Sequence, residues 1–213
     1  MSTARVYGGQ TADERVRARR RQLLDAGLAQ LGDAGWAGAT VRGVCEAAGL
    51  STRFFYESFA NLEALAGEVY DEIAALVTEE ILAAIAAVPA DDRAGQADAA
   101  VRTMVDALTG DPRRARVLLV EAHAAPALAP RRAASLAGLA EIIATLGRER
   151  YPAGPDAEPT IRIAATLLAG GLSELMVAWV DGALPVDRER LVADCSALVA
   201  GFGDLAAEIA AGR

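Results

Sequence analysis

The chain has 213 residues, of which 53% are hydrophobic and only 5% aromatic, and its formal net charge is −8. This length allows a sizeable buried core. The apolar content is carried by Ala, Leu and Val, and its Ala and Leu favour helices. The first ten residues lack the apolar core of a signal peptide. No uninterrupted apolar run approaches the roughly 20 residues that span a bilayer, so we expect a cytoplasmic protein without a membrane segment.

The charge is divided unevenly along the chain. Residues 1–59 carry eight Arg and six acidic residues, a net of +2, whereas the remaining 154 residues carry 13 Arg and 23 acidic residues, a net of −10. A basic head on an acidic body favours binding of a polyanion through the head. The alternative is that the basic run is only a solvated face of the first helix. That run consists of Arg15, Arg17, Arg19, Arg20 and Arg21.

The first predicted helix follows a loose arm at residues 1–12 and runs from Asp13 to about Gly35. Its apolar residues recur at spacings of three, four and seven, which is typical of an amphipathic helix; they are Val16, Leu23, Leu24, Leu28 and Leu31. Gly27 and Gly32 weaken it. Trp36 follows the terminating glycine, and we expect its ring to dock back against the helix.

Two short helices are predicted next. Thr40 is a good N-cap for the first, which places Val44, Cys45 and Ala48 on one face. Gly49 breaks this helix, and Ser51 is expected to cap the second, in which Phe55 and Phe59 lie four residues apart on a shared buried face. Two helices joined by a tight turn containing Gly, the second with exposed polar groups, are typical of a helix-turn-helix.

The rest of the chain predicts a larger bundle. A long helix covers about 61–88, and Gly and Pro residues separate further helices at about 95–109, 112–125, 130–151, 159–182 and 188–210. No strand-like alternation stands out. The prediction is an all-α fold of about nine helices, with an N-terminal three-helix domain at 1–60 and a larger C-terminal helical domain at 61–213.

Residues that would indicate an enzyme or a metal site are sparse. The sequence has one histidine, no Gly-rich phosphate loop, no metal-ligand spacing and no arrangement of a nucleophile with a base. We therefore expect no catalytic site, no metal and no cofactor. Cys45 and Cys195 both fall within apolar helical patterns, which favours two buried thiols over a disulfide or a metal pair.

The helix-turn-helix pattern gains specificity from a combination of short motifs. They are R-R-Q-L-L-D-A-G-L at 20–28, G-W at 35–36, T-V-R-G-V-C-E-A-A-G-L-S at 40–51, F-Y-E-S-F at 55–59 and L-E-A-L at 62–65. This stretch, about a fifth of the chain, resembles the DNA-binding region of the TetR family of bacterial regulators. The resemblance implies a homodimeric regulator with an N-terminal DNA-binding domain and a C-terminal domain for ligand binding and dimerisation.

Carried over position by position, the resemblance implies a set of residues at the DNA surface: Arg42, Thr52, Arg53, Phe54 and Tyr56. Arg42 and Arg53 are candidate base readers, because Arg can bond guanine O6 and N7 together. Thr40, Tyr56 and Ser58 are candidate phosphate contacts. The alternatives are a packing role for Tyr56 and a solvated charge for Arg53.

Three departures from the family pattern limit this transfer. Arg53 stands where many relatives have Gly, so the target sequence cannot be borrowed from them. Leu62 replaces a Lys that often contacts phosphate. Gly27 and Gln30 replace larger or more apolar residues in the first helix, which loosens its packing.

The resemblance implies that the last two helices, at about 159–210, form a four-helix bundle with those of a second copy. Ile163, Leu167, Gly170, Gly171, Leu175 and Ala178 make an apolar face on one, and Leu191, Cys195, Leu198, Val199, Phe202 and Leu205 make another on the next. The middle helices are expected to enclose a pocket for an effector. Its candidate lining residues are Met104, Leu108, Leu119, His123, Leu139, Ile143, Met176 and Trp179, each of which could equally be ordinary core.

These features predict a ligand-responsive transcriptional regulator. The expected form is a repressor that binds a palindromic operator in double-stranded DNA as a dimer and is released by a small apolar or amphipathic effector. The alternative is an all-α interaction or ligand-binding protein that has lost specific DNA binding.

Overall fold

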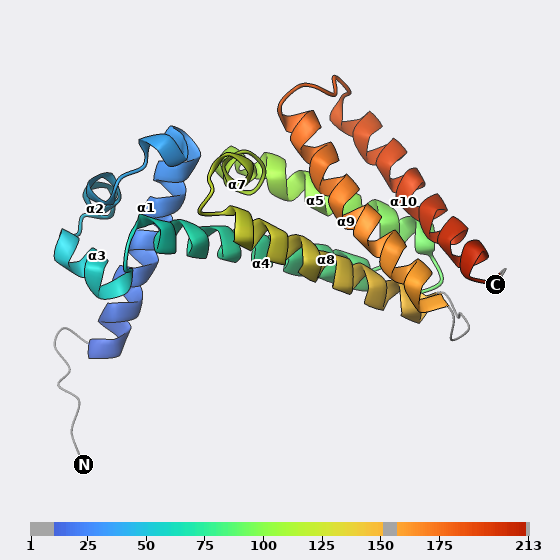
Figure 1. The fold of residues 1–213 in the computed structure, drawn as a ribbon, viewed down its shortest axis with the longest axis horizontal. Coiled ribbons are helices and arrows are strands. Elements are labelled where there is room, and N and C mark those ends of the chain that lie inside the picture. The colour runs from blue at the N-terminus through green and yellow to red at the C-terminus, as the bar shows by residue number, and fades with distance from the viewer. Residues whose placement is uncertain (1–10, 151–156, 212–213) are drawn as a thin grey trace, which may run out of the picture.

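The computed structural model describes residues 11–150 and 157–211, and these residues form helices and short loops with no strand. The predicted all-α class is therefore confirmed for the described part of the chain. Figure 1 shows a small N-terminal group of helices at one end and a larger bundle at the other, joined by the long helix α4. Most of the predicted arm at residues 1–12 lies outside the described residues, and Ala12 already belongs to the first helix.

Helix α1 spans Ala12–Gly38 and begins in a capping box. The Thr11 hydroxyl accepts a hydrogen bond from the Glu14 amide at 3.2 Å, and the Glu14 carboxylate accepts one from the Thr11 amide at 2.6 Å. These two bonds satisfy backbone donors that a helix start leaves open. The predicted end near Gly35 is a kink within the helix, since Gly35 has φ 71° and ψ 176° before one more helical turn.

The two short helices form as predicted. Helix α2 spans Val41–Ala48 with Thr40 as N-cap, and Gly49 ends it at φ 65°, a left-handed conformation that glycine adopts without strain. Helix α3 spans Thr52–Ser58. Val44, Phe55 and Phe59 are at most 4% exposed, so the core expected for this domain is present.

The remaining helices follow the predicted order. They are α4 (Leu62–Ala86), α5 (Arg93–Gly110), α6 (Pro112–Ala115), η1 (Arg116–Glu121), α7 (Ala122–Ala124), α8 (Ala129–Arg150), α9 (Glu158–Val180) and α10 (Arg188–Ala211). Segments α6, η1 and α7 together occupy the single helix predicted at 112–125. The difference is that η1 is a π-helix, a wider turn that a hydrophobic pattern does not distinguish from an α-helix.

Two buried clusters hold these helices together. The first joins α1, α2 and α3 to the first half of α4 and to η1 and α7, through residues such as Leu23, Phe55 and Leu65. The second lies among α5, η1, α9 and the start of α10, around Val105 and Met176. The first cluster crosses residue 60, so α4 packs with the N-terminal domain as well as with the bundle.

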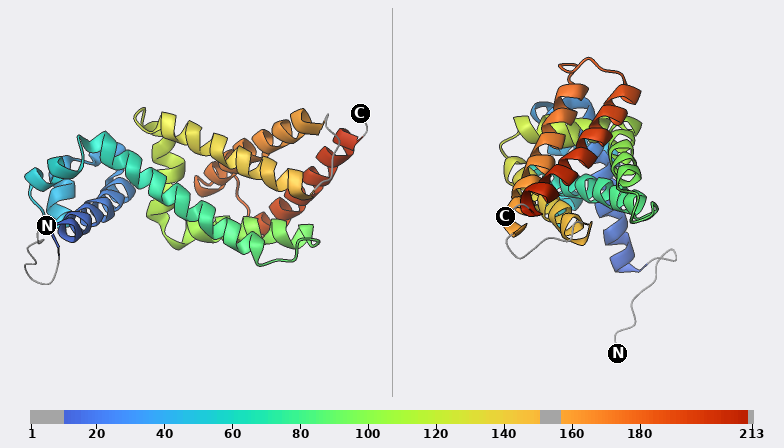
Figure 2. Two further views of the ribbon diagram at one scale, coloured as in Figure 1. Left: turned by 90° about the horizontal axis from the view of Figure 1, so that it is seen from below. Right: turned by 90° about the vertical axis from the view of Figure 1, so that its right-hand side faces the viewer.

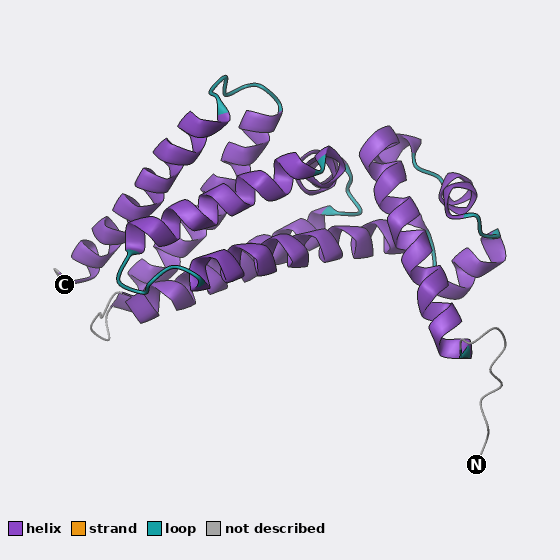
Figure 3. Ribbon diagram, turned by 180° about the vertical axis from the view of Figure 1, so that it is seen from behind, coloured by secondary structure: helices purple, strands orange, loops and turns teal. Residues whose placement is uncertain are grey.

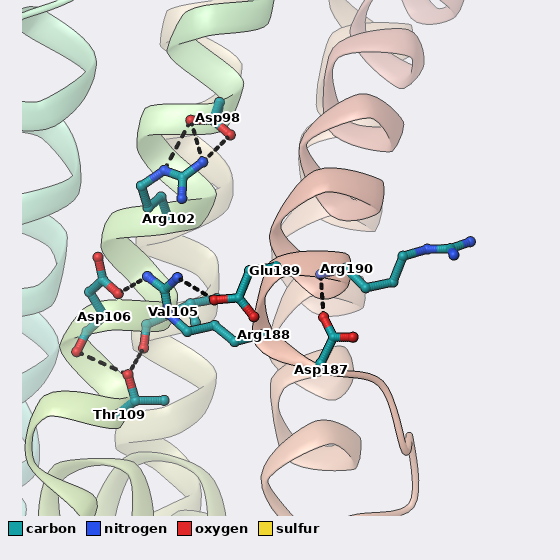
Figure 4. Close-up of polar contacts among 9 residues, drawn as sticks. All are labelled: Asp98, Arg102, Val105, Asp106, Thr109, Asp187, Arg188, Glu189 and Arg190. Atoms are coloured by element: carbon teal, nitrogen blue, oxygen red, sulfur yellow. Dashed lines mark hydrogen bonds and ion pairs between the residues drawn. The ribbon is translucent and has the colours of Figure 1, made fainter.

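Helices α9 and α10 lie side by side along one flank of the bundle (Figures 1 and 2). Ionic and backbone contacts fix the beginning of α10, where the Arg188 guanidinium pairs with Asp106 of α5 and lies 3.7 Å from Glu189 (Figure 4). The Asp187 carboxylate accepts a hydrogen bond from the Arg190 amide at 2.7 Å. From behind, the loops are confined to the ends of the helices (Figure 3).

Candidate nucleic-acid interface and effector cavity

Helix α3 has one buried face and one exposed face. Phe55 is fully buried, and its ring meets the Phe59 ring at 5.8 Å between centroids. Thr52, Arg53 and Tyr56 are exposed, and Tyr56 retains 61% of its surface. The Tyr56 ring still stands edge-on to Phe55 at 5.4 Å. Tyr56 therefore contacts the core of the domain and still leaves most of its surface exposed.

The two candidate base readers are held in the same way. Arg42 on α2 donates from Nε to Glu46 Oε1 at 2.8 Å, and Arg53 on α3 donates from Nε to Glu57 Oε1 at 3.0 Å. Both arginine side chains are more than four-fifths exposed. The hydrogen bond and charge of Glu46 raise the pKa of Arg42. Exposed ion pairs of this kind are weak, so phosphates or base edges can displace the glutamates.

The other three predicted DNA contacts are more engaged with the protein. Phe54 is half-buried beneath the Arg19 guanidinium, which lies 4.5 Å from its ring centroid. The Thr40 hydroxyl accepts a hydrogen bond from the Gly43 amide at 3.0 Å, which leaves its own proton available to a phosphate. Ser58 is half-buried, and its backbone carbonyl accepts from Arg20 Nη1 at 2.6 Å.

The basic run on α1 divides into two groups. Arg20 pairs with Glu68, with 3.1 Å from its Nε to Glu68 Oε1, and Arg21 pairs with Glu72 at 2.8 Å. Both partners lie on α4, so these two arginines fasten α1 to α4. Arg17 extends along its own helix toward the Asp13 carbonyl, and Arg19 covers Phe54.

A buried carboxylate joins the N-terminal domain to η1. Glu121 is 6% exposed and accepts a hydrogen bond from the Trp36 amide, 85 residues away, at 2.8 Å. Its other oxygen accepts from Arg116 Nε at 3.0 Å, and Arg116 also donates to the Asp33 carbonyl at 3.2 Å. Since Trp36 and Asp33 flank the kink at Gly35, this contact holds the end of α1 against the bundle.

We expect Glu121→Ala to destabilise this junction by about 1–3 kcal/mol, because it leaves the partly buried Trp36 amide without an acceptor. Urea denaturation followed by Trp36 fluorescence, in a Trp179→Phe background, measures the effect. The matched control is Glu141→Ala on α8, a more exposed glutamate that pairs with Arg148 and Arg162. Equal unfolding free energies for the two variants would contradict a special role for Glu121.

An apolar cavity of about 240 Å³ opens among α4, α5, α8, α9 and α10. It lies between the second half of α4, the first half of α5 and the second half of α8, at the end of the bundle away from α3 (Figure 1). Small residues on α10 leave this space open. They are Ala200, Gly203, Ala206, Ala207 and Ala210.

Three of the eight predicted pocket residues, Met104, Leu139 and Ile143, line this cavity. The other five do not. Leu108, Leu119 and Met176 belong to the second buried cluster, and Trp179 packs against it. Leu108, Met176 and Trp179 lie one or two helical turns beyond Met104 and Leu172, the last lining residues of α5 and α9, whereas Leu119 lies on η1, which supplies no lining residue. The lining residues that the sequence prediction missed include the small residues of α10 and three polar ones, Arg93, Gln96 and Arg150. A run of Ala and Gly along one helix was the available signal.

His123 lies on the surface of the bundle. Its Nε2 is 3.3 Å from Glu174 Oε1, its Nδ1 contacts the Leu119 carbonyl, and Arg132 shares the same carboxylate. Within residues 11–150 and 157–211, no three His, Cys, Asp or Glu side chains gather as a metal site would require.

Both cysteines are free and buried, as predicted. Burial raises the pKa of the Cys45 and Cys195 thiols. The thiolate is the nucleophilic form, so both are poor nucleophiles.

Helix α9 is long and apolar enough to cross a bilayer by length and composition, with a mean hydropathy of 1.7 over its most apolar window. Only 17% of that window is buried. We call the exposed large apolar side chains of α9 and α10 the α9–α10 apolar face; they are Ile163, Leu167, Val180, Leu198, Leu205 and Ile209.

Comparison with known proteins gives a family for the N-terminal domain. Residues 23–69 match the model of the bacterial regulatory proteins of the tetR family. A search of curated proteins found no match.

The fold is shared with solved regulators. The fatty acid degradation regulator FadR from Bacillus halodurans is 21% identical, with a TM-score of 0.70 over 86% of this chain and 95% of that one. A transcriptional regulator from Pseudomonas aeruginosa PAO1 is 22% identical, with a TM-score of 0.71 over 91% and 94%. FadR from Bacillus subtilis, solved in complex with stearoyl-CoA, is 19% identical, with a TM-score of 0.71 over 85% and 98%.

Proposed function

Since this chain carries a TetR-family helix-turn-helix domain on the fold of TetR-like regulators, we propose that it is a ligand-responsive repressor that binds a palindromic DNA operator as a homodimer. The observation that carries the proposal is the exposed face of α2 and α3. Arg42, Arg53 and Tyr56 project from two helices whose apolar faces are buried. A helix presented in this way fits the major groove, where the base pairs differ in their donors and acceptors.

Arg42→Ala and Arg53→Ala are each expected to weaken specific DNA binding by roughly 5- to 150-fold, the loss associated with one bidentate base contact. Both side chains are exposed, so the variants should remain folded. Fluorescence anisotropy with DNA from beside the protein's own gene, and with a scrambled duplex at the same salt, measures the effect.

The matched control is Arg102→Ala. Arg102 also pairs with an acidic residue four positions away on its own helix, Asp98, but it lies on α5. If Arg42→Ala and Arg53→Ala bind the native duplex as tightly as Arg102→Ala, the reading surface lies elsewhere. Equal weak binding of the parent protein to both duplexes, with little salt dependence, would favour the interaction protein that no longer reads DNA.

The α9–α10 apolar face supports the homodimer. Six large apolar side chains on two neighbouring helices are between 40% and 72% exposed in one chain. Large apolar side chains that are exposed together on two neighbouring helices favour an interaction site there. A second copy that covers this face would place two reading helices apart on one DNA duplex, as recognition of a palindrome requires. The same burial accounts for the apolar character of α9 without a membrane.

The cavity supports the effector. Its walls are almost wholly apolar, and the similar FadR from Bacillus subtilis was solved with stearoyl-CoA, a ligand with a long hydrocarbon chain. We take the effector to be a molecule with an apolar part that fills this cavity. Helix α4 connects the two sites, because its first half packs in the core with Phe55 and its second half supplies Ile81 and Ile85 to the cavity wall.

A further inference from the structure

The cavity is polar at one end only. Its inner part is lined by apolar side chains such as Met104, Leu139 and Leu172. Arg93, Gln96 and Arg150 lie at the opposite end, where α5 begins and α8 ends. The remaining polar residue of the lining, Thr78, donates its hydroxyl proton to the Ala74 carbonyl at 2.8 Å. Apart from Thr78, a ligand in this cavity therefore meets polar side chains at one end only.

Arg150 is distinguished by the charge of its partners. It donates from Nε to Gln96 Oε1 at 2.7 Å and from Nη1 to the Leu146 carbonyl at 3.2 Å, and both acceptors are neutral. All eleven other arginines that the structure describes after residue 59 form an ion pair with a carboxylate; they are Arg93, Arg102, Arg113, Arg114, Arg116, Arg131, Arg132, Arg148, Arg162, Arg188 and Arg190. Of all the arginines that the structure describes after residue 59, Arg150 alone has no carboxylate among its described contacts.

Gln96 fixes the position of the Arg150 side chain. The Gln96 side-chain amide donates to the carbonyls of Val88 and Pro89, at 3.3 Å each, so its oxygen is turned toward Arg150. Gln96 is only 7% exposed. A half-buried guanidinium held by neutral acceptors keeps its full charge and spare N–H donors, which favours an anion as its partner.

A second hollow of about 700 Å³ adjoins the cavity on the outside. The two spaces share Leu82, Ile85, Gln96, Leu146 and Arg150, so Arg150 and Gln96 lie at the boundary between them. The loop at 87–90 forms another wall of the outer hollow. A ligand that crosses this boundary has its tail among apolar side chains and its head beside Arg150.

The acidic residues that the structure describes near Arg150 form no ion pair with it. Glu149 also lines the outer hollow but is exposed. Asp204 pairs with Arg93 at 3.4 Å.

We infer that the effector is an amphiphile with an anionic head group, carboxylate or phosphate, bound by Arg150 at the mouth of the cavity, with its hydrocarbon tail directed inward. This inference rests on the proposed function for the claim that a ligand in this cavity regulates DNA binding. The binding itself does not depend on DNA. Arg is protonated at every accessible pH. The affinity for a carboxylate ligand should therefore change with pH only as the ligand's own carboxyl group ionises.

The test is isothermal titration calorimetry of the full chain with four probes that share a twelve-carbon tail, each below its micelle concentration. They are dodecanoate, dodecyl phosphate, dodecanol and dodecyltrimethylammonium. We expect at least one anionic probe to bind at least tenfold more tightly than dodecanol and the cation. The preferred anion tells whether the head group is a carboxylate or a phosphate.

Variants assign the effect to Arg150. Arg150→Met should weaken binding of the preferred anion at least tenfold and leave dodecanol binding unchanged, while Arg150→Lys should retain part of the preference. The matched control, Arg148→Met, removes an arginine from the same helix that pairs with Glu158 and Glu141, and should bind the anion normally. Circular dichroism confirms that each variant is folded.

Wild-type binding that ignores head-group charge would overturn the inference, and so would normal binding of the anion by a folded Arg150→Met. DNA binding measured on the same preparation separates this outcome from the proposed function. A protein that binds its operator but shows no preference for anions refutes the inference alone. A protein that binds the anion but no DNA refutes the proposed repressor function and leaves the anion site at Arg150 supported.

Discussion

Leu198→Asp is expected to leave the chain folded and to convert the dimer into monomers. Leu198 is 72% exposed, the highest value in the α9–α10 apolar face, so its replacement costs the isolated chain little. Two-fold symmetry would bury the residue twice in a dimer. Burial of one leucine side chain is worth about 1.5–3 kcal/mol, so the loss is about 3–6 kcal/mol of dimerisation free energy before the cost of burying two carboxylates.

Sedimentation equilibrium measures the dimer dissociation constant directly. The matched control is Leu76→Asp, which changes a leucine that is 37% exposed on α4, outside the α9–α10 apolar face. This control should remain dimeric. A Leu198→Asp protein that dimerises as well as the control would place the interface elsewhere. The monomer should also lose most of its operator affinity, since one reading helix makes half of the contacts.

Phe55→Ala is expected to unfold α3, the helix that we propose to contact the bases. Phe55 has no exposed surface and packs against Phe59 in the first buried cluster. Truncation of a buried Phe to Ala costs about 3–5 kcal/mol. Helix α3 has only seven residues, and a helix of that length is held by its packing rather than by its own propensity. DNA binding should therefore be lost with the packing.

Urea denaturation measures this loss through Trp36, which packs against the same cluster. A Trp179→Phe background removes the signal of the second tryptophan. Phe54→Ala is the control, because it truncates the neighbouring residue of the same type, which is only half-buried beneath Arg19. It should cost much less stability. Similar unfolding midpoints for Phe54→Ala and Phe55→Ala would show that burial on α3 does not determine its stability.

The helix-turn-helix was predictable because its signals are local. The spacing of Val44, Phe55 and Phe59 indicates their buried faces, and Gly49 marks the turn at the residue where φ becomes positive. The two buried free cysteines were also predictable from the apolar patterns around them. In each case the residues that decide the structure lie near one another in the sequence.

The cavity was less predictable because it depends on how five helices lie against one another. Large apolar residues such as Met176 and Leu108 suggest a pocket by their type, yet they fill the second cluster. The space opens where α10 presents Ala and Gly. The contact of Glu121 with the Trp36 amide joins positions 85 residues apart, and no periodicity along the chain reports such a pair.

The first buried cluster also bears on how this protein could be recombined. It unites α1, α2 and α3 with α4, η1 and α7 in one continuous core, and Glu121 adds a polar contact across the same surface. The N-terminal domain is thus not an independent module on a linker. A chimera that joins residues 61–213 to the DNA-binding domain of another protein would divide this core near residue 60. It should therefore keep the residues of α1 that pack against α4, η1 and α7. The same packing constrains evolution, so substitutions on the two sides of this core are expected to occur together.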